Sequence, residues 1–126
     1  MGDVFAIGIG GALGAMARFG VSVWIDGRTG ARFPWGTLAV NALGCLALGA
    51  LMAWFATHDD PSRRLRLFAA TGFLGAFTTF STFGFETLAL ARDGRHGAAL
   101  ANVGLQLVVG GLAAVIGHVG LSRLLE

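Results

Sequence analysis

The segment AALANVGLQLVVGGLAAVIGHVGL, residues 98–121, contains no aspartate, glutamate, lysine or arginine. It is longer than the ~20 mostly apolar residues that a helix needs to cross a bilayer. Three further apolar segments precede it, at about 4–25, 35–57 and 65–91. The sequence therefore predicts an all-α membrane protein in which residues 1–126 form a single domain of four transmembrane helices.

The composition points to the same environment. Hydrophobic residues make up 55% of the chain, and the mean hydropathy is +0.71. Charged residues make up 13%, about half of the ~25% that is typical of a soluble domain. The connections between the four segments are too short to fold independently. We expect membrane lipid to surround most of the protein.

The polar chemistry of the sequence argues against several other classes of protein. The basic residues are arginines scattered through connections and segment ends rather than gathered in a stripe, which predicts no nucleic-acid partner. The single cysteine, Cys45, is interpreted as a packing residue within a span. No nucleophile with a base, phosphate-binding loop or paired carboxylates is found in the sequence, so we expect that the protein is not an enzyme.

The distribution of arginines bears on membrane orientation. With an even number of spans, both termini lie on one face of the membrane. Apart from Arg18, which lies within the first span, the arginines then divide equally: Arg63, Arg64, Arg66 and Arg123 on the side of the termini, and Arg28, Arg32, Arg92 and Arg95 on the other. Positive charge sets orientation, so this balance predicts dual topology and an antiparallel homodimer. A single orientation set by Arg64 and Arg66 is the alternative.

Glycine is abundant, with 21 residues, and Gly10 and Gly14 form a Gly-x-x-x-Gly pair. Such small residues allow helices to approach closely in lipid. The pattern predicts close helix packing without identifying the partner helix.

Polar side chains within the spans are the candidates for function, because they are costly at membrane depth. They are Arg18, Asn41, Thr78, Thr79, Ser81, Thr82, Glu86, Asn102 and Gln106.

The third segment is the least regular. Gly72, Gly75 and four hydroxyl residues stand in its middle, where glycine weakens a helix and hydroxyls can bend it. We predict a break in the third helix near its middle, where freed backbone carbonyls can bind a cation. The alternative is a continuous helix whose hydroxyl groups bond internally.

Helical spacing predicts that Thr79, Thr82, Phe83 and Glu86 share one face, with Phe80 beside it. The edge of a phenyl ring is electropositive and can face an anion, although two phenylalanines three residues apart also suit simple packing. Asn41 has two N–H groups that can replace part of an anion's hydration shell. A hydrogen bond between helices is its alternative role.

Three stretches together resemble the Fluc (CrcB) family of fluoride channels. They are Gly10-Gly11-Ala12-Leu13-Gly14-Ala15-x-x-Arg18, Pro34-Trp35-Gly36-Thr37-Leu38-x-Val40-Asn41-x-x-Gly44 and Gly72-Phe73-Leu74-Gly75-x-Phe77-Thr78-Thr79-Phe80-Ser81-Thr82-Phe83. The fourth segment is similar in hydropathy alone. The family usually has a track of hydroxyl residues there, whereas this chain has Asn102, Gln106 and Gly110.

The resemblance implies a fluoride-selective channel that passively exports toxic fluoride from the cytoplasm across the inner membrane of a prokaryotic cell. It implies an antiparallel, dual-topology homodimer with two pores and a central structural sodium ion (Na⁺). The backbone carbonyls of Gly75 and Thr78 would hold the sodium. The fluoride pore would be formed by Asn41, Phe80, Phe83, Ser81 and Thr82, with Thr79, Glu86, Asn102 and Gln106 as further possible pore-lining residues.

Two other functions are weighed against this one. A small multidrug-type, proton-coupled exporter also has four helices, but it needs a carboxylate in the middle of the first span, where this chain has Arg18. A non-transporting membrane assembly subunit would need only the glycine-rich helices. It would leave Asn41 and the hydroxyl and phenylalanine residues of the third segment unexplained.

Overall fold

The computed structural model describes residues 1–30, 32–58 and 62–126. Its helices are α1 (Gly2–Thr29), α2 (Trp35–Thr57), α3 (Arg63–Arg66), η1 (Leu67–Leu74), α4 (Gly75–Phe77), α5 (Phe80–Arg92) and α6 (His96–Leu125). Elements α3 to α5 follow one another in a single rod, so the described residues form four helical rods that are long and apolar enough to cross a membrane. The predicted all-helical, four-span architecture is confirmed.

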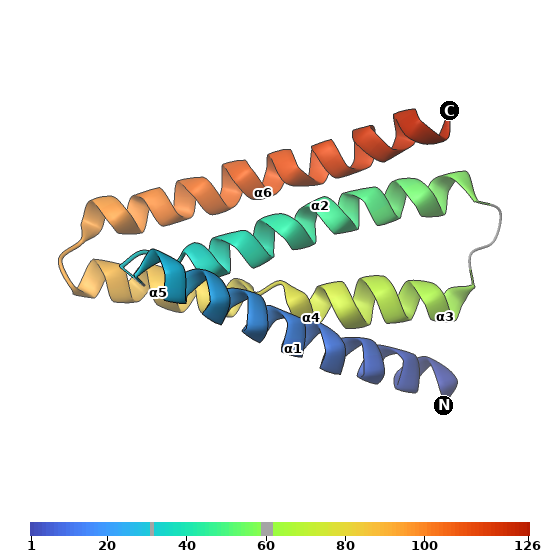
Figure 1. The fold of residues 1–126 in the computed structure, drawn as a ribbon, viewed down its shortest axis with the longest axis horizontal. Helices are drawn as coiled ribbons and strands as arrows, with labels where there is room; N and C mark the ends of the chain where they lie inside the picture. The colour runs from blue at the N-terminus through green and yellow to red at the C-terminus, as the bar shows by residue number, and fades with distance from the viewer. Residues whose placement is uncertain (31, 59–61) are drawn as a thin grey trace.

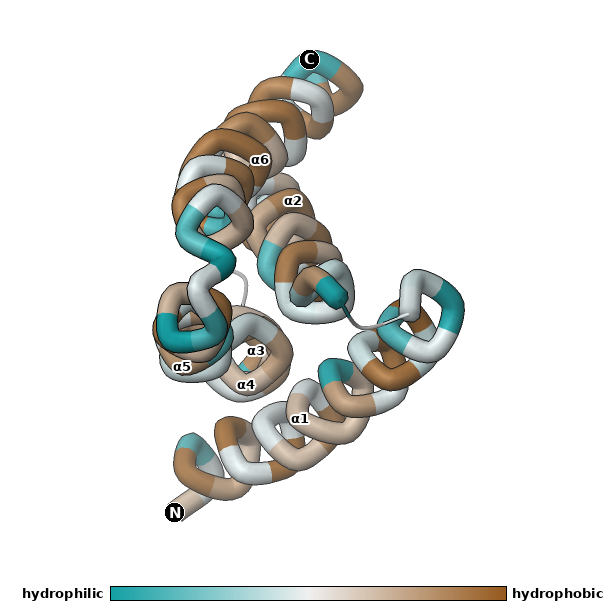
Figure 2. The backbone as a smooth tube through the Cα atoms, turned by 90° about the vertical axis from the view of Figure 1, so that its left-hand side faces the viewer, coloured by the Kyte–Doolittle hydropathy of each residue, from teal (hydrophilic) through white to brown (hydrophobic). Residues whose placement is uncertain are grey.

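The rods run lengthwise through the molecule, with both termini at the same end (Figure 1). Helix α2 lies between α6 and the rod formed by α3, η1, α4 and α5, while α1 crosses that rod obliquely (Figures 1 and 2). The tube is predominantly apolar along its rods (Figure 2). Large apolar side chains on every rod are exposed, among them Phe19, Leu43, Phe85 and Leu107. An apolar exterior of this kind is suited to lipid.

Three of the four rods are longer than predicted. The first continues past residue 25 to Thr29, so residues 26–29 are the last turn of α1 and not a connection. Gly30 ends the helix with φ 78°, and its N–H donates to the Asp26 carbonyl at 3.1 Å. This is a common helix ending, because glycine adopts positive φ without steric cost. The third and fourth rods begin two residues earlier than expected, at Arg63 and His96, and end at Arg92 and Leu125.

The third rod changes its geometry along its length. Ser62 caps α3 by accepting a hydrogen bond from Leu65 N at 3.2 Å. The chain then widens into the π-helix η1 and returns to α-helix in α4. Thr78 and Thr79 have extended backbone dihedrals (ψ 157° and 111°) before α5 begins at Phe80. The backbone groups next to these two residues therefore need partners other than those of a regular helix.

Glycines allow the rods to approach closely at two crossings. A Cβ atom added to Gly10 or Gly14 would overlap backbone atoms of Phe68 or Phe73 in η1. On the other side of the bundle, a Cβ on Gly117 of α6 would overlap the carbonyl oxygen of Leu46 in α2. The Gly-x-x-x-Gly pair thus packs against the third rod of its own chain.

We predict that Gly117→Ala destabilises the bundle, because its new methyl group meets rigid backbone. Overpacking of this kind typically costs ~1–3 kcal/mol. Thermal unfolding of the purified protein in detergent should show a lower midpoint. Gly111→Ala is the matched control on the same helix, since a Cβ there meets nothing within 4 Å. Equal midpoints for the two variants would contradict the close crossing.

Candidate functional site

A pocket of about 320 Å³ lies beside the extended residues of the third rod. Its lining comes from α2, the third rod and α6, and consists of Asn41, Gly44, Cys45, Leu48, Ala70, Leu74, Gly75, Thr78, Thr79, Phe80, Phe83, Gln106 and Leu107. Most of the site residues predicted from the sequence therefore gather around this cavity, the central pocket.

Asn41 fastens α2 to the extended backbone. Its Oδ1 atom accepts a hydrogen bond from Thr79 N at 2.8 Å, and its Nδ2 atom donates to Thr79 O at 3.2 Å. The same Nδ2 donates to Gln106 Oε1 at 3.0 Å. One side chain thus pairs both backbone groups of Thr79, as buried backbone requires, and also links α2 to α6.

The hydroxyl groups of Thr79, Ser81 and Thr82 meet at the start of α5. Thr79 Oγ1 accepts from Thr82 N at 3.2 Å, so Thr79 is the N-cap of the helix. The Thr79 hydroxyl also donates to Thr82 Oγ1 at 2.8 Å, and its oxygen lies 3.5 Å from Ser81 Oγ. Ser81 and Thr82 are exposed on a single chain and lie outside the pocket lining.

Phe80 and Phe83 form an edge-to-face pair. Their ring centroids are 5.4 Å apart, and the ring planes meet at 62°. Phe83 is 9% exposed, whereas Phe80 is 80% exposed on a single chain. Both residues line the pocket, so aromatic side chains form part of its wall.

Gly75 and Thr78 also line this pocket. In a regular helix the Gly75 carbonyl would pair with Thr79 N, but that N–H donates to Asn41. The Thr78 carbonyl would pair with Thr82 N, but that N–H donates to Thr79 Oγ1. Both oxygens are thereby released from their usual helical partners.

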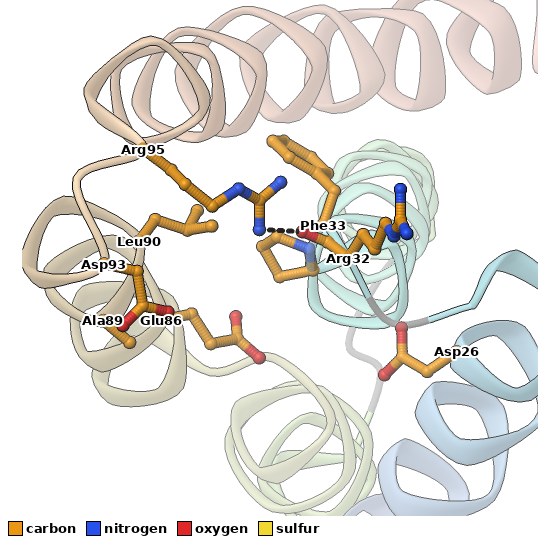
Figure 3. Close-up of a pocket in the computed structure, with 9 residues that line it drawn as sticks. Asp26, Arg32, Phe33, Glu86, Ala89, Leu90, Asp93 and Arg95 are labelled. Atoms are coloured by element: carbon orange, nitrogen blue, oxygen red, sulfur yellow. Dashed lines mark hydrogen bonds between the residues drawn. The ribbon is translucent and has the colours of Figure 1, made fainter.

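Glu86 lines a second pocket, of about 300 Å³ (Figure 3). The connection from α5 to α6, which borders it, lies at the end of the bundle opposite the termini (Figure 1). The lining residues are Asp26, Arg32, Phe33, Pro34, Glu86, Ala89, Leu90, Asp93 and Arg95. Glu86 Oε1 accepts from Thr37 Oγ1 at 2.8 Å, and the Arg95 guanidinium donates to the Arg32 carbonyl. Glu86 therefore belongs to this charged pocket and not to the cavity around Asn41. The predicted helical face shared by Thr79 and Glu86 is not formed, because Thr79 lies in the extended segment before α5.

Asn102 is fully buried, with 0% exposure, and lines neither pocket. Its Nδ2 atom donates to Thr87 Oγ1 at 2.9 Å, and Thr87 in turn donates to the Phe83 carbonyl at 2.8 Å. This chain of hydrogen bonds joins α6 to α5. Within the described part of the chain, three buried side-chain atoms have no hydrogen-bond partner: Glu86 Oε2, Asn102 Oδ1 and Gln106 Nε2.

Sequence reasoning did not select Thr37, Thr87 or Asp26 as site residues. Thr37 and Thr87 are polar and lie within the spans, so the criterion that found Asn41 applies to them as well. The sequence places Asp26 in a connection, but it lies in the last turn of α1, and its Oδ1 atom accepts from Gly36 N at 2.9 Å. Its fixed position shows only in three dimensions.

Four membrane-spanning rods with polar side chains and a pocket between them define a multi-pass membrane protein. The chain belongs to the CrcB family, because the family model described as "CrcB-like protein, Camphor Resistance (CrcB)" matches residues 5–118. The family resemblance predicted from the sequence is thus confirmed.

Curated relatives are similar over nearly their whole length. The chain is 47% identical over 118 residues to a protein of Acidobacterium capsulatum, covering 94% of both chains. It is 48% identical over 121 residues to one of Sorangium cellulosum, covering 96% of this chain and 95% of the relative. It is 44% identical over 125 residues to one of Chloroflexus aurantiacus, covering 98% and 97%. Each relative is named "Fluoride-specific ion channel FluC". The prediction that the chain is not an enzyme is confirmed by its membership of this ion-channel family.

Proposed function

We propose that this protein is a fluoride-selective ion channel that lets toxic fluoride leave a prokaryotic cell passively across its inner membrane. Family membership and the names of its relatives support the ion and the reaction class. The observation that carries the proposal is the cavity inside the spans, where Asn41, Phe80, Phe83 and Gln106 meet beside an interruption of regular helix.

An anion in a membrane needs groups that replace its hydration shell. N–H and O–H donors from Asn41, Gln106 and the hydroxyl cluster of Thr79, Ser81 and Thr82 are of the required type, as are the edges of the two phenyl rings. Asn102 and Glu86 continue this polar path toward the charged pocket. There, Arg32 and Arg95 attract anions, and three carboxylates moderate that attraction.

Fluoride flux from liposomes is the direct test. Purified protein reconstituted with internal potassium fluoride should release fluoride to an ion-selective electrode when valinomycin is added, and chloride-loaded liposomes should release almost nothing. Proton-dependent release of a cationic drug would instead favour a small multidrug-type exporter. No flux of any solute would favour a membrane assembly subunit.

The proposed channel is an antiparallel homodimer of dual topology. On a single chain, Phe80 and Gly75 are exposed although both line the central pocket. A second copy placed over them would complete the wall of that pocket. Two-fold symmetry would then give two equivalent pores, one beside each copy of the cavity.

Balanced arginines predict that tags on the termini will be reached from both sides of the membrane. Membrane-impermeant labelling of inside-out and right-side-out vesicles should therefore modify comparable fractions of the protein. Adding two or three lysines to one face should fix one orientation, so that the altered chain alone loses fluoride flux. Co-expression with a copy that has lysines on the opposite face should restore it. Labelling from one side only would contradict dual topology.

A structural sodium ion is the proposed cofactor at the centre of this dimer. The donor set fits it, because the carbonyl oxygens of Gly75 and Thr78 are released from helical pairing and carbonyl oxygen is a suitable ligand for a hard cation. Each copy would contribute these two oxygens. The ion would hold the two interrupted rods together, while Asn41 fixes the backbone that carries them.

We predict that sodium remains bound when the purified dimer is dialysed against sodium-free potassium buffer, and that elemental analysis detects it. Thr78→Ala should keep the ion and most of the flux, because the carbonyl remains. The variant loses the Cγ2 methyl group beside Gly44 and the side-chain hydrogen bond from Thr78 Oγ1 to Leu74 O, a bond typically worth ~0.5–1.5 kcal/mol. Complete loss of sodium with an intact, conducting dimer would contradict the assignment.

A further inference from the structure

The side-chain amide of Gln106 has an orientation that backbone groups determine. Thr79 N is a donor without ambiguity, so the atom of Asn41 that faces it at 2.8 Å is the acceptor Oδ1. The other atom of that amide is therefore Nδ2, and it faces Thr79 O and Gln106. Since Nδ2 can only donate, the atom of Gln106 it contacts is Oε1. The Gln106 nitrogen must then point elsewhere.

This arrangement distributes the donors unequally between the two amides. Asn41 Nδ2 has two hydrogens, and it makes two hydrogen bonds, to Thr79 O and to Gln106 Oε1. Gln106 Nε2 also has two hydrogens, but it is buried and has no partner among the described residues. An unpaired buried donor is costly and calls for an explanation.

We propose that Gln106 donates the hydrogen bond to fluoride in the central pocket, and that Asn41 is a positioning residue that holds the Gln106 amide in its donating orientation. The proposal rests on the proposed fluoride channel and identifies the donor within it. Gln106 lines the same pocket as Phe80 and Phe83, so the free amide nitrogen and the ring edges serve one anion.

Enclosure of Nε2 adds a basis for selectivity. The atom is covered by protein, so an anion reaches it only when the surrounding side chains part. A smaller anion requires a smaller displacement in a closely packed interior. It also gains more from a hydrogen bond, because its charge is concentrated. An unpartnered donor in a tight site thus favours fluoride over larger halides.

Gln106→Met tests the proposal, because methionine has similar length and no N–H group. The variant should lower fluoride flux by about 10- to 100-fold, the range expected for losing one hydrogen bond to a charged group. Leu105→Met, one residue earlier on α6 and outside the pocket lining, is the matched control and should conduct like the unmodified protein. Both variants should purify as dimers with the same melting midpoint.

If Asn41 and not Gln106 donates to fluoride, the expected effect of Gln106→Met on flux is the opposite. If Asn41 were the donor, removing Gln106 Oε1 would free one of its hydrogens, so Gln106→Met should conduct as fast as the unmodified protein or faster. That result, with the unmodified protein active, would overturn the inference. An unmodified protein without fluoride flux would instead refute the proposed function.

Asn41→Ala tests the positioning role. If Asn41 acts through Gln106, the double variant with Gln106→Met should conduct no more slowly than Gln106→Met alone. A reduction in the double variant equal to the product of the two single reductions would show that Asn41 acts independently of Gln106, either on the anion or through the Thr79 backbone, and the proposed positioning role would be wrong.

Discussion

Replacing Phe80 or Phe83 by isoleucine should reduce fluoride flux by about 100-fold or more while the dimer still purifies, a loss that corresponds to ~2.7 kcal/mol on the barrier. Isoleucine retains apolar bulk but has no electropositive ring edge. The two rings form an edge-to-face pair in the wall of the central pocket. If they served packing alone, a swap that nearly conserves volume would cost less than ~1.5 kcal/mol of stability and leave flux unchanged.

Phe85→Ile is the matched control for these variants. Phe85 lies on the same helix, is 70% exposed on a single chain and lies outside the pocket lining. The Phe85→Ile channel should therefore conduct normally. Flux is to be measured with equal numbers of dimers per liposome, and the melting midpoint of each variant reports on its fold. Normal flux through both pocket variants would mean that ring edges do not stabilise the anion.

The sequence predicted the fold well because hydropathy is a strong signal in a membrane protein. Lipid requires each span to be a helix with an apolar exterior, and the range 35–57 coincides with α2. The ends of the other spans were less predictable, because helices continue into the interface until a residue such as Gly30 ends them. Hydropathy does not distinguish an interfacial helical turn from a connection.

The site was only partly predictable. Polar residue type at membrane depth identified Asn41, Thr79 and Gln106, which the structure brings together. Helical spacing grouped Glu86 with them, but Glu86 bonds to Thr37 in a separate pocket. Spacing describes one helix at a time, whereas the separation of the two pockets depends on how α2 packs against the third rod.

The orientation of a hydrogen-bonded amide is a further property that the sequence alone cannot reveal. Asparagine at position 41 offers donors and acceptors equally. Only the backbone N–H of Thr79, placed by the extended conformation there, determines which atom faces which neighbour. Residue type thus predicted that Asn41 matters, while the three-dimensional network indicates which of its bonds are already in use.

Asn41→Asp should abolish fluoride flux, because it reverses the polarity of this network with almost no change in shape. One carboxylate oxygen can still accept from Thr79 N, but the other replaces Nδ2 and faces the acceptors Thr79 O and Gln106 Oε1. The Gln106 amide must then turn to donate to the aspartate, so that its N–H groups are no longer free for an anion. An ionised aspartate would also repel the anion.

The variant should lose some stability as well, since a buried acceptor without a donor costs ~1–3 kcal/mol. Its melting midpoint and dimer content must therefore be measured beside its flux. Asn41→Ala serves as the comparison, because it removes the same hydrogen bonds to Thr79 and Gln106 without adding a charge, and we expect it to retain more flux than Asn41→Asp. The contradicting result is fluoride release by Asn41→Asp within about twofold of the unmodified protein. A change that small corresponds to much less than ~1.4 kcal/mol on the barrier, because ~1.4 kcal/mol is a tenfold change in rate. Combined with normal flux through Phe80→Ile and Phe83→Ile, that result would place the pore outside the central pocket.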